Sequence, residues 1–173
     1  MIRNYCFSLI NYLRRHKIRT AIGGILLLWY IFCLPSPLFK EGYATVVESR
    51  EGKLLGGKIA PDGQWRFPER DTVPHKLREA ILAFEDAHFY YHWGVNPIST
   101  AKALLTNLRH GHTVRGGSTL TQQVIRLARK NKARTYGEKL IEAIWATRLE
   151  FRYSKDKILA LYASHAPFGG NVI

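Results

Sequence analysis

Residues 115–130 read Arg-Gly-Gly-Ser-Thr-Leu-Thr-Gln-Gln-Val-Ile-Arg-Leu-Ala-Arg-Lys and join a glycine-rich loop to a segment of helical character. Ser118 or Thr119 can cap a helix here, because a side-chain hydroxyl accepts a hydrogen bond from a backbone N–H of the first turn. We predict that this helix runs to about Lys130. Its first turn is a candidate anion site, since its N–H groups lack helical partners; a plain helix cap is the alternative.

The distribution of charge around this helix is uneven. No Asp or Glu occurs from Ala87 to Gly137. The same segment contains eight basic residues: Lys102, Arg109, Arg115, Arg126, Arg129, Lys130, Lys132 and Arg134. Glu85 and Glu142 lie on either side of it, and two carboxylates beside a cationic surface suit proton abstraction next to an anionic, phosphorylated substrate. A solvated, positively charged face is the plain alternative.

Periodic apolar residues predict further helices on both sides of this segment. We expect helices over residues 73–85, from Pro97 to about Leu108, from Thr135 to about Arg152, and from Ser154 onward. Asn96 is the expected cap of the second of these helices, and Gly111 is expected to close it. Thr135 and Glu138 have the spacing of a capping box. The domain is therefore expected to be mainly α.

A β-rich linker is expected before these helices, over residues 40–72. β-Prone runs occur at residues 44–47, 53–55 and 64–67, with turn dipeptides between them. A small ribbon that joins the preceding segment to the domain explains them better than a binding site does.

Residues 18–39 are expected to form a transmembrane anchor. The chain has 173 residues and a formal net charge of +13, and its first basic cluster precedes an uncharged run from Thr20 to Phe39. About twenty helical residues span the core of a bilayer. The positive flank, residues 1–17, is expected to stay in the cytoplasm, which leaves the rest of the chain outside. Cys6 and Cys33 then cannot form a disulfide with each other. A cleavable signal peptide is the alternative.

Glu85 and Asp86 are the first candidate catalytic residues. They precede a cluster of aromatic and histidine side chains at residues 88–93. We expect a carboxylate beside such bulk to be partly desolvated, which favours it as a base near neutral pH. A local cap or ion pair is the alternative. His88 and His92 have no partners at metal-ligand spacing, so hydrogen-bonding roles are expected for both.

Glu142 is the second candidate acid, on the helix that follows the basic segment. Lys139 precedes it by three residues, so the two side chains share a helix face. A local ion pair is the simplest explanation of this spacing. Arg126 lies on the helix after the glycine-rich loop, and the combination of loop and cation is more informative than either part.

Four motifs resemble, in the same order, the signatures of glycosyltransferase family 51. Residues 85–94, Glu-Asp-Ala-His-Phe-Tyr-Tyr-His-Trp-Gly, are similar to the first signature, E-D-x-x-F-x-x-H-x-G. Residues 117–123, Gly-Ser-Thr-Leu-Thr-Gln-Gln, resemble the second. Lys139-x-x-Glu142 resembles the third, and residues 152–159 resemble the fourth.

The resemblance implies a mainly α, lysozyme-like glycosyltransferase domain over residues 73–173. Its implied activity is polymerisation of lipid II into peptidoglycan glycan strands, with inversion and release of undecaprenyl pyrophosphate. Glu85 is the implied general base and Glu142 a second essential acid. Substrate binding is implied for Ser118, Thr119, Gln123, Arg126, Lys139 and Arg152. Structural roles near the site are implied for Asp86, Phe89, His92 and Gly94, and no metal ligand is implied.

Partners and location are also implied by the resemblance. The expected partners are lipid II, nascent peptidoglycan and membrane lipids, with cell-wall synthesis proteins as further candidates, and helix 97–108 would face the membrane. The expected location is the bacterial inner membrane, with one span, a cytoplasmic N-terminus and a periplasmic domain. No cofactor is implied with certainty, and Mg²⁺ stays open as for the family. Nucleic acid is not an expected partner, because the anchor leaves the basic segment outside the cytoplasm.

Three positions depart from the family pattern: Glu138 replaces the usual Arg, Asn96 a common Asp and Arg126 a common Lys. The sequence ends at Ile173, before the family's fifth signature and closing helices, so we expect a C-terminally incomplete domain. It would be either a fragment of a longer protein or a truncated gene product. The alternative function is a non-catalytic, membrane-anchored remnant that at most binds lipid II. A lysozyme-like hydrolase is a further alternative.

Overall fold

The computed structural model describes residues 15–112, 114, 116–133 and 135–168. The chain divides into two compact units, residues 1–35 and residues 36–173. The described part of the first unit is built around α2, which runs from Lys17 to Phe32 and buries none of its side chains. Large apolar side chains of α2 are exposed to solvent: Ile22, Ile25, Leu26, Leu27 and Leu28.

The helix within the expected anchor ends at Phe32, before the end of the uncharged run at Phe39. Pro35 and Pro37 explain the early end. Proline has no N–H to donate within a helix, and it disfavours helical conformation in the residue before it. Within the described residues, no helix combines the length and the apolar character needed to cross a membrane.

A two-stranded antiparallel ribbon lies near the start of the second unit, as predicted. Its strands are β1 (Thr45–Glu48) and β2 (Leu54–Lys58), with Val46 opposite Gly57. A Cβ atom added at Gly57 would lie 2.8 Å from the Cη2 atom of Trp65. The Trp65 ring can therefore pack against the ribbon only because position 57 has no side chain.

The third predicted strand, residues 64–67, is reduced to an isolated β-bridge at Trp65. This segment is fixed by a side chain instead, because the buried Arg66 guanidinium donates to Gly42 O (3.1 Å) and to Asp62 Oδ2 (2.8 Å). A single backbone bond, from Ala44 N–H to Arg66 O (2.7 Å), joins it to the chain leading into β1. A buried guanidinium requires such partners, and it leaves no ladder for a third strand.

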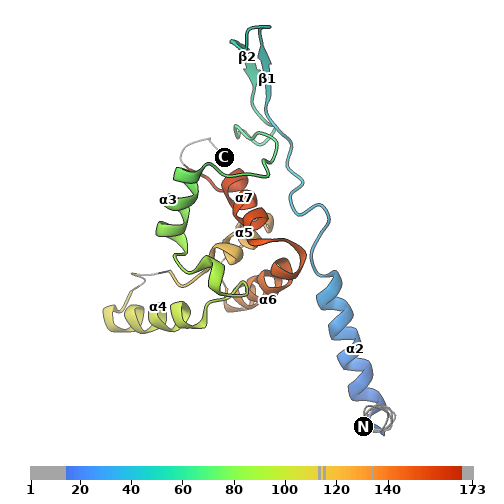
Figure 1. Cartoon of the computed structure of the whole chain (residues 1–173). Helices are drawn as coiled ribbons and strands as arrows, with labels where there is room; N and C mark the ends of the chain where they lie inside the picture. Colours follow the sequence, from blue (N-terminus) through green and yellow to red (C-terminus); the bar gives the residue numbers. More distant parts are fainter. Residues whose placement is uncertain (1–14, 113, 115, 134, 169–173) are drawn as a thin grey trace, which may run out of the picture. The chain divides into compact units, whose positions relative to one another are not determined.

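Three helices supply the core of the second unit (Figure 1): α5 (Leu120–Ala128), α6 (Tyr136–Arg152) and α7 (Lys155–His165). Their fully buried side chains include Leu120, Val124, Ile125, Leu149, Ile158 and Leu159. Each such side chain contributes about 1.5–3 kcal/mol by leaving water. The glycine-rich loop thus leads into the most buried helix, and the mainly α prediction is confirmed.

The first motif lies on the end of α3 (His75–Glu85) and on the 3₁₀ turn η1 (Phe89–Tyr91), and a further helix, α4 (Pro97–His110), follows it. Only Ile81 of α3 is buried. A polar contact at the surface links η1 to α7, where Tyr90 OH donates to Asp156 Oδ1 at 2.8 Å. Arg78 of α3 lies over the Tyr90 ring, 5.2 Å from its centroid.

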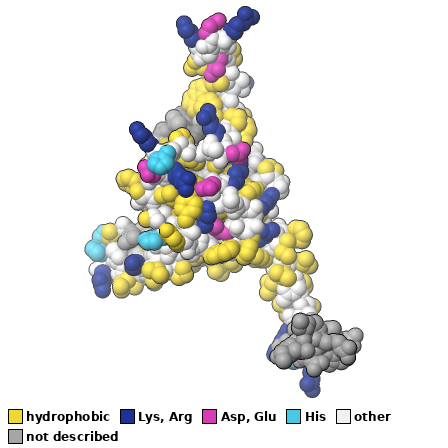
Figure 2. All heavy atoms as spheres, viewed as in Figure 1, with side chains coloured by type: hydrophobic (Ala, Val, Ile, Leu, Met, Phe, Trp, Pro, Cys, Tyr) yellow, Lys and Arg dark blue, Asp and Glu magenta, His cyan; other side chains and the backbone are white. Residues whose placement is uncertain are grey.

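The amphipathic character predicted for α4 is confirmed. Ala103 is buried, and the opposite side of the helix exposes Ile98, Leu104, Leu105 and Leu108. Figure 2 shows hydrophobic side chains gathered along the outer edge of α4. An exposed row of large apolar side chains is typical of a surface that contacts lipid or another protein.

The predicted caps are present. Asn96 Oδ1 accepts from Ser99 N–H at 3.0 Å, and Gly111 closes α4 at φ +71°. Thr119 forms a reciprocal capping box with Gln122 at the start of α5. Thr135 and Ser154 cap α6 and α7 through their hydroxyls. The capping box expected at the start of α6 is only half formed, because the Glu138 carboxylate pairs with Arg129.

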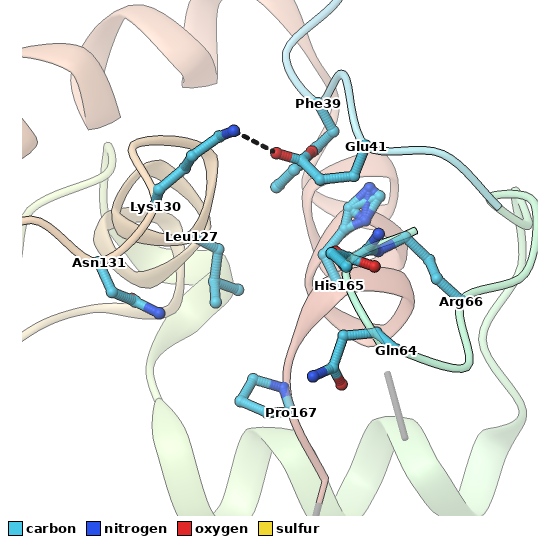
Figure 3. A pocket seen from close by; sticks show the side chains of 10 residues that line it. Phe39, Glu41, Gln64, Arg66, Leu127, Lys130, Asn131, His165 and Pro167 are labelled. Carbon is cyan, nitrogen blue, oxygen red and sulfur yellow. Dashed lines mark hydrogen bonds and ion pairs between the residues drawn. The ribbon is translucent and has the colours of Figure 1, made fainter. Parts of the chain in front are cut away.

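A cavity of about 420 Å³ lies beside the ends of α5 and α7 (Figure 3). His165, the last residue of α7, is buried at its edge, with the Phe39 ring edge-on at a centroid distance of 3.5 Å. Burial and the nearby Arg66 guanidinium lower the pKa of His165 to about 4, against the opposite influence of Glu41. Glu69 Oε1 lies 3.2 Å from His165 Nε2 and would favour the protonated ring. The His165 side chain is only 5% exposed, however, so the loss of hydration dominates and favours the neutral ring.

We expect His165 to make the fold sensitive to acid. An unfolded histidine has a pKa of about 6.5, so the unfolded chain binds this proton first as the pH falls. Stability that is present above about pH 6.5 is then lost as the pH falls towards 4, by about 2–3 kcal/mol. Urea unfolding at pH 7 and at pH 4.5 measures this loss in the wild type and in His165→Gln. The variant should lose less stability over this interval, and equal losses would refute the expectation.

Candidate active site

Glu85 is the last residue of α3, and its carboxylate meets a side chain of α5. Glu85 Oε2 accepts a hydrogen bond of 2.7 Å from Gln123 Nε2. The expectation that Glu85 is partly desolvated is wrong, since it is exposed and its neighbour Asp86 is the buried acid. Helix α3 ends at Glu85, and the side chain of the next residue, Asp86, is buried in the domain. An exposed carboxylate fixed by one hydrogen bond remains open to a substrate hydroxyl.

Asp86 and His92 join the first motif to the start of α5. Asp86 Oδ2 lies 2.8 Å from His92 Nε2 and accepts from Leu120 N–H at 3.0 Å. Burial alone would raise the pKa of Asp86, but the hydrogen bonds from His92 and Leu120 outweigh it and hold the pKa below its usual value. The hydrogen-bonding role predicted for His92 is confirmed. These contacts hold the first turn of α5 beside the end of α3.

Gly94 is the closest point of contact between the first motif and α6. Its φ is +80°, and a Cβ atom there would lie 2.7 Å from both C and O of Ala146. Its carbonyl oxygen accepts a hydrogen bond of 2.6 Å from Thr119 Oγ1. Glycine is required here for both conformation and space. Thr119 is buried in this contact, so its hydroxyl supports the loop.

A network of polar side chains connects the motifs, and the sequence did not predict it. Glu150 Oε1 accepts from Thr121 Oγ1 (2.6 Å) and from Lys155 Nζ (2.8 Å). Lys155 Nζ also donates to His92 O (2.6 Å) and lies 4.4 Å from the centroid of the buried Phe89 ring. The network ties η1, α5, α6 and α7 together. The only sequence signal was that Thr121 and Lys155 lie within the second and fourth motifs.

Arg126 and Glu142 form a bidentate ion pair across α5 and α6. Arg126 Nε and Nη2 donate to the two carboxylate oxygens of Glu142, each at 2.9 Å. Arg126 Nη2 also donates to Ser118 Oγ at 3.1 Å. Hydrogen bonding to Glu142 raises the pKa of Arg126 despite its partial burial. Removing one partner of such a pair would leave the other charge buried and unpaired.

These residues line a cavity of about 590 Å³ between α4, the glycine-rich loop and α6. Four of the predicted site residues border it: Ser118, Arg126, Lys139 and Glu142. Glu138 also borders it and is paired with Arg129, whose guanidinium lies 4.4 Å from the Trp145 centroid. Two cations and two carboxylates therefore face the cavity. Lys139 is exposed and makes no ion pair with any described residue.

A second cavity, of about 500 Å³, lies on the other side of Arg126. Gln123, Lys132 and Tyr162 border it together with Arg126. Since Gln123 also binds Glu85, the candidate base lies next to this second cavity, and Arg126 is common to both. This arrangement can hold an anionic group at Arg126, while Gln123, about one helical turn earlier on α5, binds the carboxylate base.

Two residues predicted to bind substrate, Thr119 and Arg152, border neither cavity. Arg152, at the end of α6, donates from Nη2 to Ser36 Oγ (3.0 Å), and its guanidinium lies 5.2 Å from the Tyr153 ring. The substrate-binding role of both residues stays a prediction.

The residues that face the cavities do not form a metal site. Glu138 and Glu142 are engaged by arginines, and in the described ranges no group of three His, Cys, Asp or Glu side chains is arranged to hold a metal ion. Mg²⁺ binds through carboxylate oxygens, so at this cavity it would have to compete with the arginines for Glu138 and Glu142.

Comparison with known proteins gives a family match. The sequence model of the family described as Transglycosylase matches residues 55–173. The chain is 41% identical to penicillin-binding protein 1C of Escherichia coli K12 over 140 residues, which is 80% of this chain and 18% of that protein. It is 43% identical to penicillin-binding protein 1B of Vibrio cholerae over 69% of this chain and 15% of that protein.

A relative of lower identity also matches. Penicillin-binding protein 1A/1B of Bacillus subtilis is 34% identical over 75% of this chain and 14% of that protein. The chain thus spans less than a fifth of the length of these relatives. The segments 62–67 and 164–171 resemble penicillin-binding protein 1C in sequence, which agrees with the first of these matches.

Proposed function

The chain belongs to the transglycosylase family, and on that premise we propose that it is a peptidoglycan glycosyltransferase of cell wall synthesis that polymerises lipid II. Glu85 is the general base. Glu142 is a supporting acid that fixes Arg126, and Arg126 and Lys139 bind the pyrophosphate. The observation that carries the proposal is that Glu85 and Arg126 are joined through one helix. Gln123 of α5 binds the carboxylate, and Arg126 follows three residues later.

The proposed reaction is a displacement at the anomeric carbon of the donor sugar. Glu85 takes the proton of the acceptor's 4-hydroxyl, and that oxygen forms a bond to the anomeric carbon. The bond from this carbon to the pyrophosphate oxygen breaks, and its electron pair leaves with undecaprenyl pyrophosphate, so the configuration is inverted. Pyrophosphate is a good leaving group, so cationic stabilisation replaces a second proton donor.

The two cations at the cavity differ in whether a carboxylate already binds them, and this difference determines how the pyrophosphate leaving group would bind. Arg126 is already engaged by Glu142, so an incoming pyrophosphate would share its guanidinium with that carboxylate. The exposed Lys139 ammonium is free of described ion-pair partners and supplies the additional positive charge. Ser118 binds Arg126 at 3.1 Å and offers a hydroxyl at the same point.

The proposed location is the outer side of the bacterial inner membrane. Exposed apolar side chains on α2, and separately on α4, support contact with lipid. The proposed organisation is a cytoplasmic tail over 1–17, an anchor over 18–39, a linker over 40–72 and a glycosyltransferase domain from 73 onward. Membrane lipids, nascent peptidoglycan and cell-wall synthesis proteins are the proposed partners.

Polymerisation of synthetic lipid II by the full chain in phospholipid vesicles tests the function. The expected products are glycan strands, resolved on a gel from a labelled substrate, and free undecaprenyl pyrophosphate. Binding of lipid II by a folded sample without product would favour a non-catalytic role. Release of sugars from finished peptidoglycan without lipid pyrophosphate would identify a hydrolase. Either result would overturn the proposal.

A further inference from the structure

Tyr162 lies behind the candidate base, on a helix that the proposed mechanism does not use. It belongs to α7, is 7% exposed, and its hydroxyl lies 3.5 Å from Gln123 Oε1. Gln123 Nε2 in turn donates to Glu85 Oε2 at 2.7 Å. A chain of hydrogen bonds therefore runs from α7 through α5 to the end of α3.

The amide of Gln123 has two different ends. Its oxygen only accepts hydrogen bonds and its nitrogen only donates them, so one orientation alone satisfies both neighbours. A donor at Oε1 fixes Nε2 towards the carboxylate. The phenol of Tyr162 is such a donor.

We propose that Tyr162 is a positioning residue for Glu85, acting through Gln123, and this inference rests on the proposed function of Glu85 as base. The hydroxyl of Tyr162 holds the Gln123 amide in the orientation that donates to Glu85. An exposed carboxylate at a helix end has few other constraints: among the described residues, Glu85 accepts a hydrogen bond from Gln123 and interacts with Tyr162 itself. Orientation of a base by a second residue increases the rate of proton transfer without contributing to substrate binding.

The surroundings of Tyr162 agree with this role. Burial, together with the Glu85 carboxylate, raises the pKa of Tyr162 to about 12, so its hydroxyl stays a donor throughout the neutral range. The Phe168 ring meets the Tyr162 ring edge-on at a centroid distance of 6.5 Å. Tyr162 and Gln123 both border the cavity of about 500 Å³. The contributions of the ring and of the hydroxyl can be measured separately, because Tyr162→Phe keeps the ring packing and removes the hydroxyl.

A double-mutant cycle of Tyr162→Phe and Gln123→Ala, measured as glycan polymerisation by the full chain in vesicles, tests the proposal. Tyr162→Phe should lower kcat about three- to tenfold, the equivalent of one neutral hydrogen bond, and leave KM unchanged. In the Gln123→Ala background the effect of Tyr162→Phe on kcat should be clearly smaller than in the wild type. Tyr90→Phe is the matched control, since it removes a 2.8 Å hydrogen bond to the same helix, away from Glu85. Its kcat should equal that of the wild type.

The inference would be overturned if Tyr162→Phe had the kcat of the wild type, or if the effects of the two substitutions on kcat simply multiplied in the double mutant. It would also be overturned if Tyr162→Phe melted at a temperature well below that of Tyr90→Phe. Failure of the proposed function is a separate result, an inactive wild type or an active Glu85→Gln. The hydrogen-bond arrangement can then still be measured by labelling the three glutamines, Gln64, Gln122 and Gln123, with ¹⁵N. The Gln123 side-chain protons should exchange slowly in the wild type and rapidly in Tyr162→Phe, and unchanged exchange would refute the positioning role.

Discussion

Replacing Glu85 by glutamine is expected to lower the rate of glycan polymerisation by about 10²–10⁴-fold, the range for loss of a general base. The amide has nearly the volume of the carboxylate and can still pair with Gln123, so the fold around α3 should persist. It cannot take the acceptor's proton at neutral pH. The expected change is therefore in kcat, with lipid II binding retained.

Glu79→Gln is the matched control for this experiment. Glu79 lies on the same helix, is exposed, and has an ordinary surface contact of 3.5 Å with His75. Its loss should leave polymerisation within a factor of about two, because surface ion pairs contribute little. Polymerisation of labelled lipid II by both variants at equal concentration decides the matter. A Glu85→Gln enzyme as active as Glu79→Gln would exclude Glu85 as the base.

Local signals explain why much of the fold could be predicted. Asn96, Thr119, Thr135 and Ser154 each cap a helix at the predicted position, because a cap depends on residues only three positions away. Gly111 likewise ends α4 through its own backbone conformation. Such features need no knowledge of the tertiary structure.

Features that depend on distant partners could not be predicted in this way. The run at 64–67 has β-prone residues, but the buried guanidinium of Arg66 fixes it as a loop. Glu138 has the position of a capping-box acid, yet it pairs with Arg129, nine residues away on another helix. In both segments an arginine with little exposure to solvent is paired with a carboxylate, and that pairing is not visible in the local sequence pattern.

The charge distribution around the candidate site differs from the one that the sequence suggests. The carboxylate-free segment 87–137 suggested an unopposed cationic surface. In the folded chain, Arg126 and Arg129 are neutralised by Glu142 and Glu138 of the next helix. Counting charges along a sequence cannot show this, because α5 and α6 pack against each other only in the fold. The partial desolvation expected of a carboxylate in this pair is found at Asp86, whereas Glu85, the candidate base, is exposed.

Gly94→Ala is expected to cause the largest loss of stability. The positive φ of Gly94 costs a residue with a side chain about 1–2 kcal/mol. The new Cβ would also lie 2.7 Å from the backbone of Ala146, and backbone atoms in the middle of α6 cannot rotate away as a side chain does. Overpacking of this kind adds about 1–3 kcal/mol. The sum, about 2–5 kcal/mol, is a large part of the 5–15 kcal/mol typical of a domain.

Gly111→Ala separates the two contributions. Gly111 has a similar φ, +71°, but a Cβ atom there would meet nothing within 4 Å. Urea unfolding of both variants should show a smaller loss for Gly111→Ala, and the difference measures the contact between Gly94 and α6. Gly94→Ala should also weaken the 2.6 Å hydrogen bond from Thr119 and so disturb the start of α5. Equal losses of stability in the two variants would mean that α6 can shift away from residue 94 at little cost in free energy. The first motif would then not be packed firmly against α6.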